Sequence, residues 1–236
     1  MGFNKITFDN NATYTGELKD GMIRHGFGKQ VWPDGTVYEG QWVNDKACGR
    51  GKLVHIDGDI YDGEWLNDKA EGYGAYTHSN GTRYEGDWRD DKQHGQGREI
   101  WRDGAVYNGN FENGKKFGKG KIVFSDGSYY DGEFFENNIH GFGNYVWNDG
   151  KNYTGYWKAN KMDGKGKIFW NDGRSYEGEY KDDKKSGYGV YKWSDGRVYE
   201  GYWLNGRQEG EGFYTNKDGV RRKGVWEAGN RMQWLD

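Results

Sequence analysis

Apolar and polar residues alternate with a period of two along most of this chain, and the alternation restarts at a fixed interval. Within residues 82–88, Tyr84, Gly86 and Trp88 fall on one side of an extended chain, and charged residues fall on the other. Residues 95–101 alternate in the same way and end on Trp101. The pattern predicts two β-strands per unit, the first with one aromatic face.

The unit recurs every 23 residues, after a single step of 24, and this periodicity is typical of repeat proteins. Each unit carries Tyr-x-Gly, a large side chain two residues later, Gly-x-Gly, and an Asp-Gly or Asn-Gly dipeptide. The nine tyrosines are Tyr14, Tyr38, Tyr61, Tyr84, Tyr107, Tyr130, Tyr153, Tyr176 and Tyr199. A tenth, degraded copy has Arg222 in place of the tyrosine and keeps Gly224 and Trp226.

The glycines favour strands over helices, because glycine inside a helix costs about 1 kcal/mol relative to alanine. Asp-Gly between two alternating runs is a hairpin signal, so each unit is predicted to be a hairpin, joined to the next by another tight turn. Glycines within strands weaken a sheet unless something bulky lies over them. We therefore expect tyrosine and tryptophan rings to pack over bare glycine backbone, in ladders that line a trough of a curled sheet.

The predicted fold is all-β: an elongated, single-layer antiparallel meander of about ten 23-residue hairpin repeats, twisted and curved. We expect one repeat domain over residues 1–236, with a half repeat at 1–13, nine full repeats at 14–221 and a half repeat at 222–236. This division predicts twenty strands and a length of roughly 95 Å at 4.8 Å per strand. The extra residue between Leu18 and Gly26 predicts a loop insertion or a bulge.

Composition narrows the classes of function. Only 33% of the residues are hydrophobic, yet 18% are aromatic, and the net charge of −3 provides no field for nucleic acid. One cysteine, Cys48, excludes an intrachain disulfide and is typical of a reducing compartment. With no apolar leader and no stretch of membrane-spanning length, the chain is expected to be intracellular.

Catalysis and metal binding are not expected. The position before Gly-x-Gly holds His25, Cys48, His94 and His140 in four copies, but also glutamate, phenylalanine, aspartate and serine in others. A position that accepts all of these is a loop position and not a nucleophile. No histidine or cysteine spacing matches zinc ligands, and Gly-x-Gly recurs at the strand period without opening a helix, so no cofactor is predicted.

The phrase from Tyr84 to Tyr107, with its Tyr-Glu-Gly-Asp-Trp, His-Gly-x-Gly and Asp-Gly elements, resembles the MORN repeat (membrane occupation and recognition nexus). The resemblance covers essentially the whole chain. It implies a β-meander scaffold, and repeat-only members include radial-spoke head proteins of motile cilia and cortical scaffolds of protists. It therefore implies a cytoskeletal location, in a cilium or axoneme, and axonemal partners.

Three functions remain open at this point. The first is a non-enzymatic scaffold that binds helical segments of partner proteins, or another copy of itself, along an aromatic groove. The predicted groove residues are Tyr84, Trp88, Tyr107, Phe111, Tyr130, Phe134, Tyr153 and Trp157. The second is weak binding of phosphoinositide or phosphatidic acid at a membrane surface, through Arg221, Arg222 and Lys223. The third is regulation of an enzyme in trans.

Overall fold

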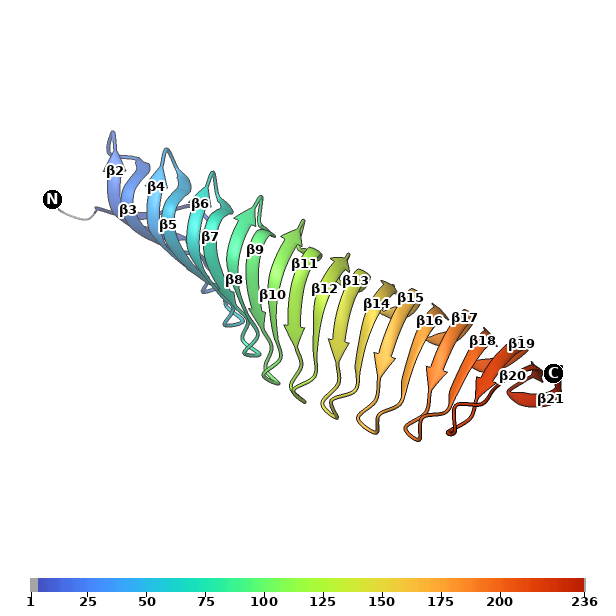
Figure 1. Ribbon diagram of the computed structural model, residues 1–236. Helices are drawn as coiled ribbons and strands as arrows, with labels where there is room; N and C mark the ends of the chain where they lie inside the picture. Colours follow the sequence, from blue (N-terminus) through green and yellow to red (C-terminus); the bar gives the residue numbers. More distant parts are fainter. Residues whose placement is uncertain (1–3, 236) are drawn as a thin grey trace. The chain divides into compact units, whose positions relative to one another are not determined.

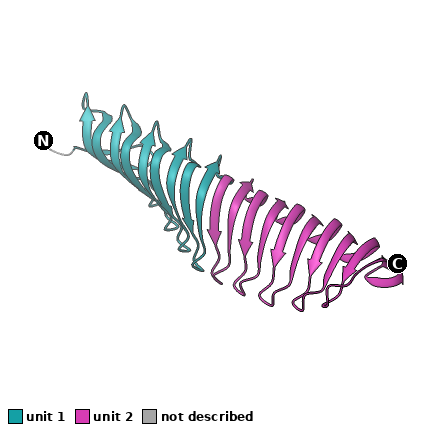
Figure 2. Ribbon diagram, in the orientation of Figure 1, with its two compact units in different colours: residues 1–116 teal, residues 117–236 magenta. Residues whose placement is uncertain are grey.

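The computed structural model describes residues 4–235, which form 21 strands and no helix (Figure 1). The strands belong to two compact units that meet in the chain between Lys116 and Phe117 (Figure 2). In residues 4–235 there is accordingly no helix able to cross a membrane. The predicted all-β meander is confirmed.

The strands of the first unit are β1 (Asn4–Thr7), β2 (Thr13–Lys19), β3 (Ile23–Val31), β4 (Val37–Val43), β5 (Lys46–Val54), β6 (Ile60–Leu66), β7 (Lys69–Thr77), β8 (Arg83–Arg89), β9 (Lys92–Ile100) and β10 (Val106–Glu112). The strand β11 (Lys115–Val123) contains the boundary between the units. The second unit continues with β12 (Tyr129–Phe135), β13 (Asn138–Val146), β14 (Asn152–Lys158), β15 (Lys161–Phe169), β16 (Ser175–Lys181), β17 (Lys184–Lys192), β18 (Val198–Leu204), β19 (Arg207–Thr215), β20 (Arg221–Glu227) and β21 (Asn230–Trp234).

Within each unit every strand pairs antiparallel with its neighbours in the chain, as in β3, β4 and β5. The loops alternate between two forms. Most of the shorter ones have two residues, such as Asn44 and Asp45, both with positive φ (47° and 67°), as a type I′ turn requires. Most of the longer ones contain the Asp-Gly dipeptide: in the β3–β4 loop the Trp32 amide donates to the Thr36 carbonyl, and Gly35 takes a φ of 94°. Both predicted turns are thus confirmed.

The predicted irregularity in the first hairpin is also present. Between β2 and β3 the loop has three residues, Asp20, Gly21 and Met22, where the other copies have two. Asp20 and Gly21 have positive φ, and the Met22 amide donates to the Lys19 carbonyl over 3.3 Å. The additional residue is therefore accommodated in the turn, without displacing the strand register that follows.

The two glycines of each Gly-x-Gly have different tasks. The first, such as Gly49, has a φ of 80° and lies beside a register shift in the β4–β5 pairing, at a bulge that bends the strand. The second, Gly51, lies directly beneath the ring of Tyr38, and so does Gly40, its partner across the strands. The predicted packing of rings over bare glycine is confirmed for the second glycine, whereas the first is required by backbone conformation.

The core of each unit lies on one face of its sheet, called here the ring face, which carries the tyrosines and the large residue four positions after each. Tyr38 packs edge to face against Trp42 of its own copy (5.0 Å, 82°) and Trp65 of the next (5.2 Å, 89°). The Tyr38 hydroxyl donates to the Gln41 carbonyl (3.0 Å), and the Trp65 indole donates to the Gly51 carbonyl (3.0 Å). The rings of Tyr38 and Trp65 thus tie one repeat to the next.

The predicted count of twenty strands is wrong by one. The tenth copy forms two strands, β20 and β21, instead of a half repeat. Trp226 is buried against Tyr199 (4.9 Å between ring centroids), and Trp234 of β21 packs against Trp226 (6.2 Å). The guanidinium of Arg222, at the tyrosine position, lies 4.3 Å from the ring centroid of Trp234. A cation–ring contact with β21 therefore takes the place of the missing tyrosine.

Alkaline pH is expected to unfold the sheet. Burial raises the pKa of Tyr38, Tyr107 and Tyr153 well above the ordinary value of about 10, and that of Tyr199 to about 12. A raised pKa means that the folded state favours the protonated ring, so stability is full below pH ~10 and falls as the pH rises towards the folded-state pKa values. Tyrosinate absorbance and circular dichroism should change together above pH ~10. Ionisation of all tyrosines with the sheet signal intact would contradict this.

Candidate functional site

The eight predicted groove residues lie on the ring face, four in each unit. Tyr107, Tyr130 and Tyr153 are 0% exposed, and Tyr84 is 2% exposed. The others are buried or, in the case of Trp88, half-buried: Phe111, Phe134, Trp157 and Trp88. The structure brings the residues of each unit together in one ladder, as predicted. Their role in binding a partner stays a prediction, and the area that these tyrosines offer to a partner is small.

A second ladder on the ring face did not emerge from the sequence analysis, although the same 23-residue step marks it. It stands at the start of each longer loop from the β3–β4 loop to the β17–β18 loop, beyond the tyrosine ladder, and is called here the outer ladder: Trp32, His55, His78, Trp101, Phe124, Trp147, Trp170 and Trp193. Its members are half-buried, except for the exposed His78. Trp147 lies 4.5 Å from Tyr145, and Trp193 lies 4.7 Å from Tyr191, between ring centroids. These rings keep surface that a partner can contact.

A third set of ring-face residues, called here the cover position, is the second residue of the strand that follows each shorter loop from β3 to β19: Arg24, Ala47, Ala70, Gln93, Lys116, Ile139, Met162, Lys185 and Gln208. Long side chains at this position lie on the rings. The Arg24 guanidinium is 4.2 Å from the ring centroid of Trp42, and the Lys116 Nζ is 4.7 Å from that of Trp101. The ring face therefore forms cation–π contacts with basic side chains of the chain itself.

The opposite face carries charged pairs with scattered exposed rings. Cross-strand ion pairs join Lys29 to Glu39 (3.7 Å) and Lys167 to Glu177 (3.0 Å), so these two glutamates, each directly after a tyrosine, lie on a solvated face. Between Phe142, Tyr156 and Tyr188 lies a hollow of about 590 Å³. Its lysines and glutamates offset each other, so this hollow has no marked charge preference.

The predicted lipid contacts do not form a basic patch. Arg221 pairs with Glu200 (2.9 Å), and Lys223 pairs with Glu211 (2.7 Å), whereas Arg222 lies on the ring of Trp234. Adjacent residues of a strand point to opposite faces, so the three side chains do not converge. Their contact with lipid stays a prediction, and the ion pairs reduce the charge that they offer.

Residues 4–235 contain no group of three or more histidine, cysteine or acidic side chains that could hold a metal. Cys48 is half-buried. One polar cluster is well ordered: the Asp59 carboxylate accepts from the Ser79 amide (2.8 Å) and the Tyr76 hydroxyl (2.7 Å), and it lies 3.0 Å from the His78 Nδ1. These hydrogen bonds, that of Ser79 first, hold the pKa of Asp59 well below its usual range. The cluster joins two consecutive loops of the first unit.

The family follows from the repeats themselves. The MORN repeat model matches nine consecutive segments, at residues 14–37, 38–60, 61–83, 84–106, 107–129, 130–151, 153–173, 176–196 and 199–221. The chain belongs to the MORN repeat family. The resemblance predicted from the sequence is therefore confirmed, and MORN repeats indicate a scaffold or interaction module.

Two further comparisons place these MORN repeats among known proteins. Phosphatidylinositol 4-phosphate 5-kinase 1 of Oryza sativa subsp. japonica is 43% identical over 44 residues, which are 19% of this chain and 5% of the kinase. The TCP10 domain of Danio rerio CPAP, solved in complex with a peptide of Danio rerio STIL, has a TM-score of 0.52 at 12% identity. That match covers 99% of both chains, and at this identity it shows the likeness of the fold alone.

Proposed function

We propose that this protein is a non-enzymatic scaffold that binds a segment of a partner protein along the ring face. The observation that carries the proposal is the outer ladder, whose half-buried tryptophans keep some exposed surface beside a core that is already closed by tyrosines. Tryptophan and tyrosine dominate the energetic anchors of protein interfaces. The solved CPAP domain of similar fold holds a peptide, which supports a peptide-binding role for such a sheet.

A helical segment suits the spacing of the outer ladder. Its rings recur every two strands, or about 9.6 Å, a distance that a helix covers in six or seven residues at 1.5 Å per residue. The proposed partner therefore has apolar residues at about that interval. A place in a cilium or axoneme, for example in a radial spoke, is part of this proposal and has its support in the resemblance to repeat-only family members.

The test compares the two faces. The protein is used as bait in an axonemal extract, cross-linked partners are identified by mass spectrometry, and one purified partner is titrated against variants. Trp147→Ala with Trp170→Ala is expected to weaken binding at least about tenfold, because each interface anchor contributes 1 kcal/mol or more. The matched control, Phe142→Ala with Tyr156→Ala, removes two rings from the opposite face of the same unit and should leave affinity unchanged.

A result in which only the Phe142 and Tyr156 pair loses binding would place the partner on the opposite face and overturn the proposal. Circular dichroism of both double variants must retain the sheet signal for the comparison to apply. Failure of both pairs to alter the affinity would also contradict a role for the rings of this unit.

Binding of lipid is the alternative function, and the short match to a phosphoinositide kinase is what favours it. Because Arg221 and Lys223 are already paired with glutamates, we expect weak flotation with vesicles that contain phosphatidic acid or phosphoinositide. This flotation should fade as salt shortens the Debye length, and should disappear when Arg221, Arg222 and Lys223 are replaced by glutamine. Tight flotation at 0.5 M salt would favour the lipid function.

A further inference from the structure

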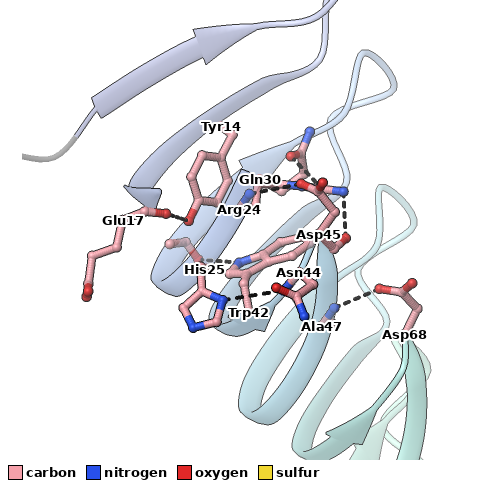
Figure 3. Close-up of polar contacts among 11 residues, drawn as sticks. Tyr14, Glu17, Arg24, His25, Gln30, Trp42, Asn44, Asp45, Ala47 and Asp68 are labelled. Atoms are coloured by element: carbon pink, nitrogen blue, oxygen red, sulfur yellow. Dashed lines mark hydrogen bonds and ion pairs between the residues drawn. The ribbon is translucent and has the colours of Figure 1, made fainter. Parts of the chain in front are cut away.

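The cover position changes character within the first unit, and this change opens a hollow on the ring face. Where other copies have long side chains, the second and third copies have Ala47 and Ala70. Above Ala47 lies a hollow of about 450 Å³, lined by rings that include Trp32, Tyr38 and Trp65. Figure 3 shows Ala47 beside Trp42. The backbone amide of Ala47 donates a hydrogen bond to the Asp68 carboxylate (2.7 Å).

The second unit shows what fills such a hollow. The cover residue six repeats later is Lys185, whose Nζ lies 4.4 Å from the ring centroid of Tyr191, 4.8 Å from Trp203, 5.3 Å from Tyr176 and 5.5 Å from Trp170. The repeat equivalents of these four rings, 138 residues earlier, are Leu53, Trp65, Tyr38 and Trp32, and all four line the hollow above Ala47. The hollow is therefore the same ring cage, with three of the four rings kept and the lysine removed.

The charges around the empty cage favour a cation more than those around Lys185 do. Burial, and then the nearby Arg174, lower the pKa of Lys185 to about 8. At the equivalents of Arg174 and Gly206, the first unit has the neutral Thr36 and the carboxylate of Asp68. Asp68 forms no ion pair in the part of the chain that the structure describes, whereas Asp45 already neutralises Arg24 (3.2 Å). One guanidinium thus faces two carboxylates at this hollow.

We propose that the hollow above Ala47 binds the side chain of a lysine from the partner protein, which occupies in trans the place that Lys185 occupies within the chain. The rings supply a cation–π surface, and Asp68 supplies the counter-charge. The inference rests on the proposed function for its occupant, but the cage itself can be tested without any partner.

The probe is Nα-acetyl-lysine methylamide, and the matched probe without charge is Nα-acetyl-norleucine methylamide. NMR of the ¹⁵N-labelled full chain follows the indole signals of Trp32 and Trp65 during titration. We expect the lysine probe to shift both signals saturably at millimolar concentration, and the norleucine probe to bind at least about fivefold more weakly, as a cation–π contribution of about 1 kcal/mol implies. Equal shifts with both probes would overturn the proposal.

Variants localise the site. Ala47→Lys places an ammonium in the cage and should abolish the probe-induced shifts, whereas Gln93→Lys adds the same charge at another cover position and should preserve them. Asp68→Asn should weaken binding of the lysine probe by up to about fivefold. Lys185→Ala should create a second cage, with new shifts at the Trp170 and Trp203 indoles. If Ala47→Lys does not fold, the last two variants decide: unchanged affinity in Asp68→Asn together with no new shifts in Lys185→Ala contradicts the proposal.

The same variants separate this inference from the proposed function. If the lysine probe binds as described but the ring-face double variant leaves partner affinity unchanged, the cage stands and the scaffold proposal fails. If the Trp147→Ala and Trp170→Ala double variant weakens partner binding but Ala47→Lys changes neither partner binding nor probe binding, the ring face is the interface. The proposal of a lysine site above Ala47 is then wrong. We expect Ala47→Lys to weaken binding of the purified partner about tenfold.

Discussion

Replacement of Gly86 by alanine is expected to destabilise the protein by about 3 kcal/mol or more, as overpacking against groups that cannot move. A Cβ built on Gly86 would lie 2.5 Å from the Gly97 Cα and still closer to the Gln96 carbonyl oxygen, and it would meet the Tyr84 hydroxyl at 2.7 Å. Two of these three contacts are backbone of the neighbouring strand. Relief would therefore require the paired strands β8 and β9 to separate.

The control is Gly81→Ala, in the loop that precedes β8. Gly81 has a φ of 93°, and an added Cβ would meet nothing within 4 Å, so alanine there costs only the conformational strain of about 1–2 kcal/mol. Urea unfolding followed by circular dichroism gives both values. If Gly86→Ala were no more destabilising than Gly81→Ala, the close packing of Tyr84 on the glycine pair would not be a determinant of stability.

The difference between these two glycines explains which part of the fold the sequence predicts. A period of two assigns Tyr84, Gly86 and Trp88 to one face, and Asp-Gly marks a turn, so hairpins and the aromatic face follow directly. The sequence does not separate a glycine needed for space from one needed for positive φ. Gly49 and Gly51 stand in one motif, yet only the structure shows a bulge at the first and the Tyr38 ring over the second.

The period of two also predicts which face of the sheet a side chain lies on, but not how deeply that side chain is buried. Tyr107 and Trp101 both point to the ring face, but Tyr107 packs against the ring of Phe111 and is fully buried, whereas Trp101 stands at the start of a loop and is only partly buried. The sequence therefore predicts the tyrosine ladder as a groove but does not indicate how completely neighbouring side chains cover each ring. The outer ladder and the cover position follow the same 23-residue step, so the repeat contained their signal.

Removal of one interior tyrosine is expected to have an effect of similar size, because its ring packs both within its own repeat and against the next one. Tyr153 is 0% exposed and packs edge to face against Trp157 (5.1 Å, 88°) and Tyr180 (5.2 Å, 87°). Its ring also lies over Gly155 and Gly166, which have no side chains to fill the space that it would leave. Tyr153→Ala should therefore cost about 3–5 kcal/mol.

Two further variants of the second unit show how much of the lost stability comes from the Tyr153 hydroxyl and how much from the ring. The Tyr153 hydroxyl donates to the Tyr156 carbonyl over 3.0 Å, so Tyr153→Phe keeps the ring, leaves a carbonyl without this donor, and should cost about 1–3 kcal/mol. Tyr202→Ala removes an exposed ring from the opposite face and should change the free energy of unfolding by no more than about 0.5 kcal/mol. In a stack held by contacts between neighbouring repeats, the loss of Tyr153 removes its ring contact with Tyr180 and weakens the interface with the next repeat. Urea unfolding should therefore become less cooperative in Tyr153→Ala, and a transition as steep as that of Tyr202→Ala would show that neighbouring repeats are coupled mainly by backbone hydrogen bonds.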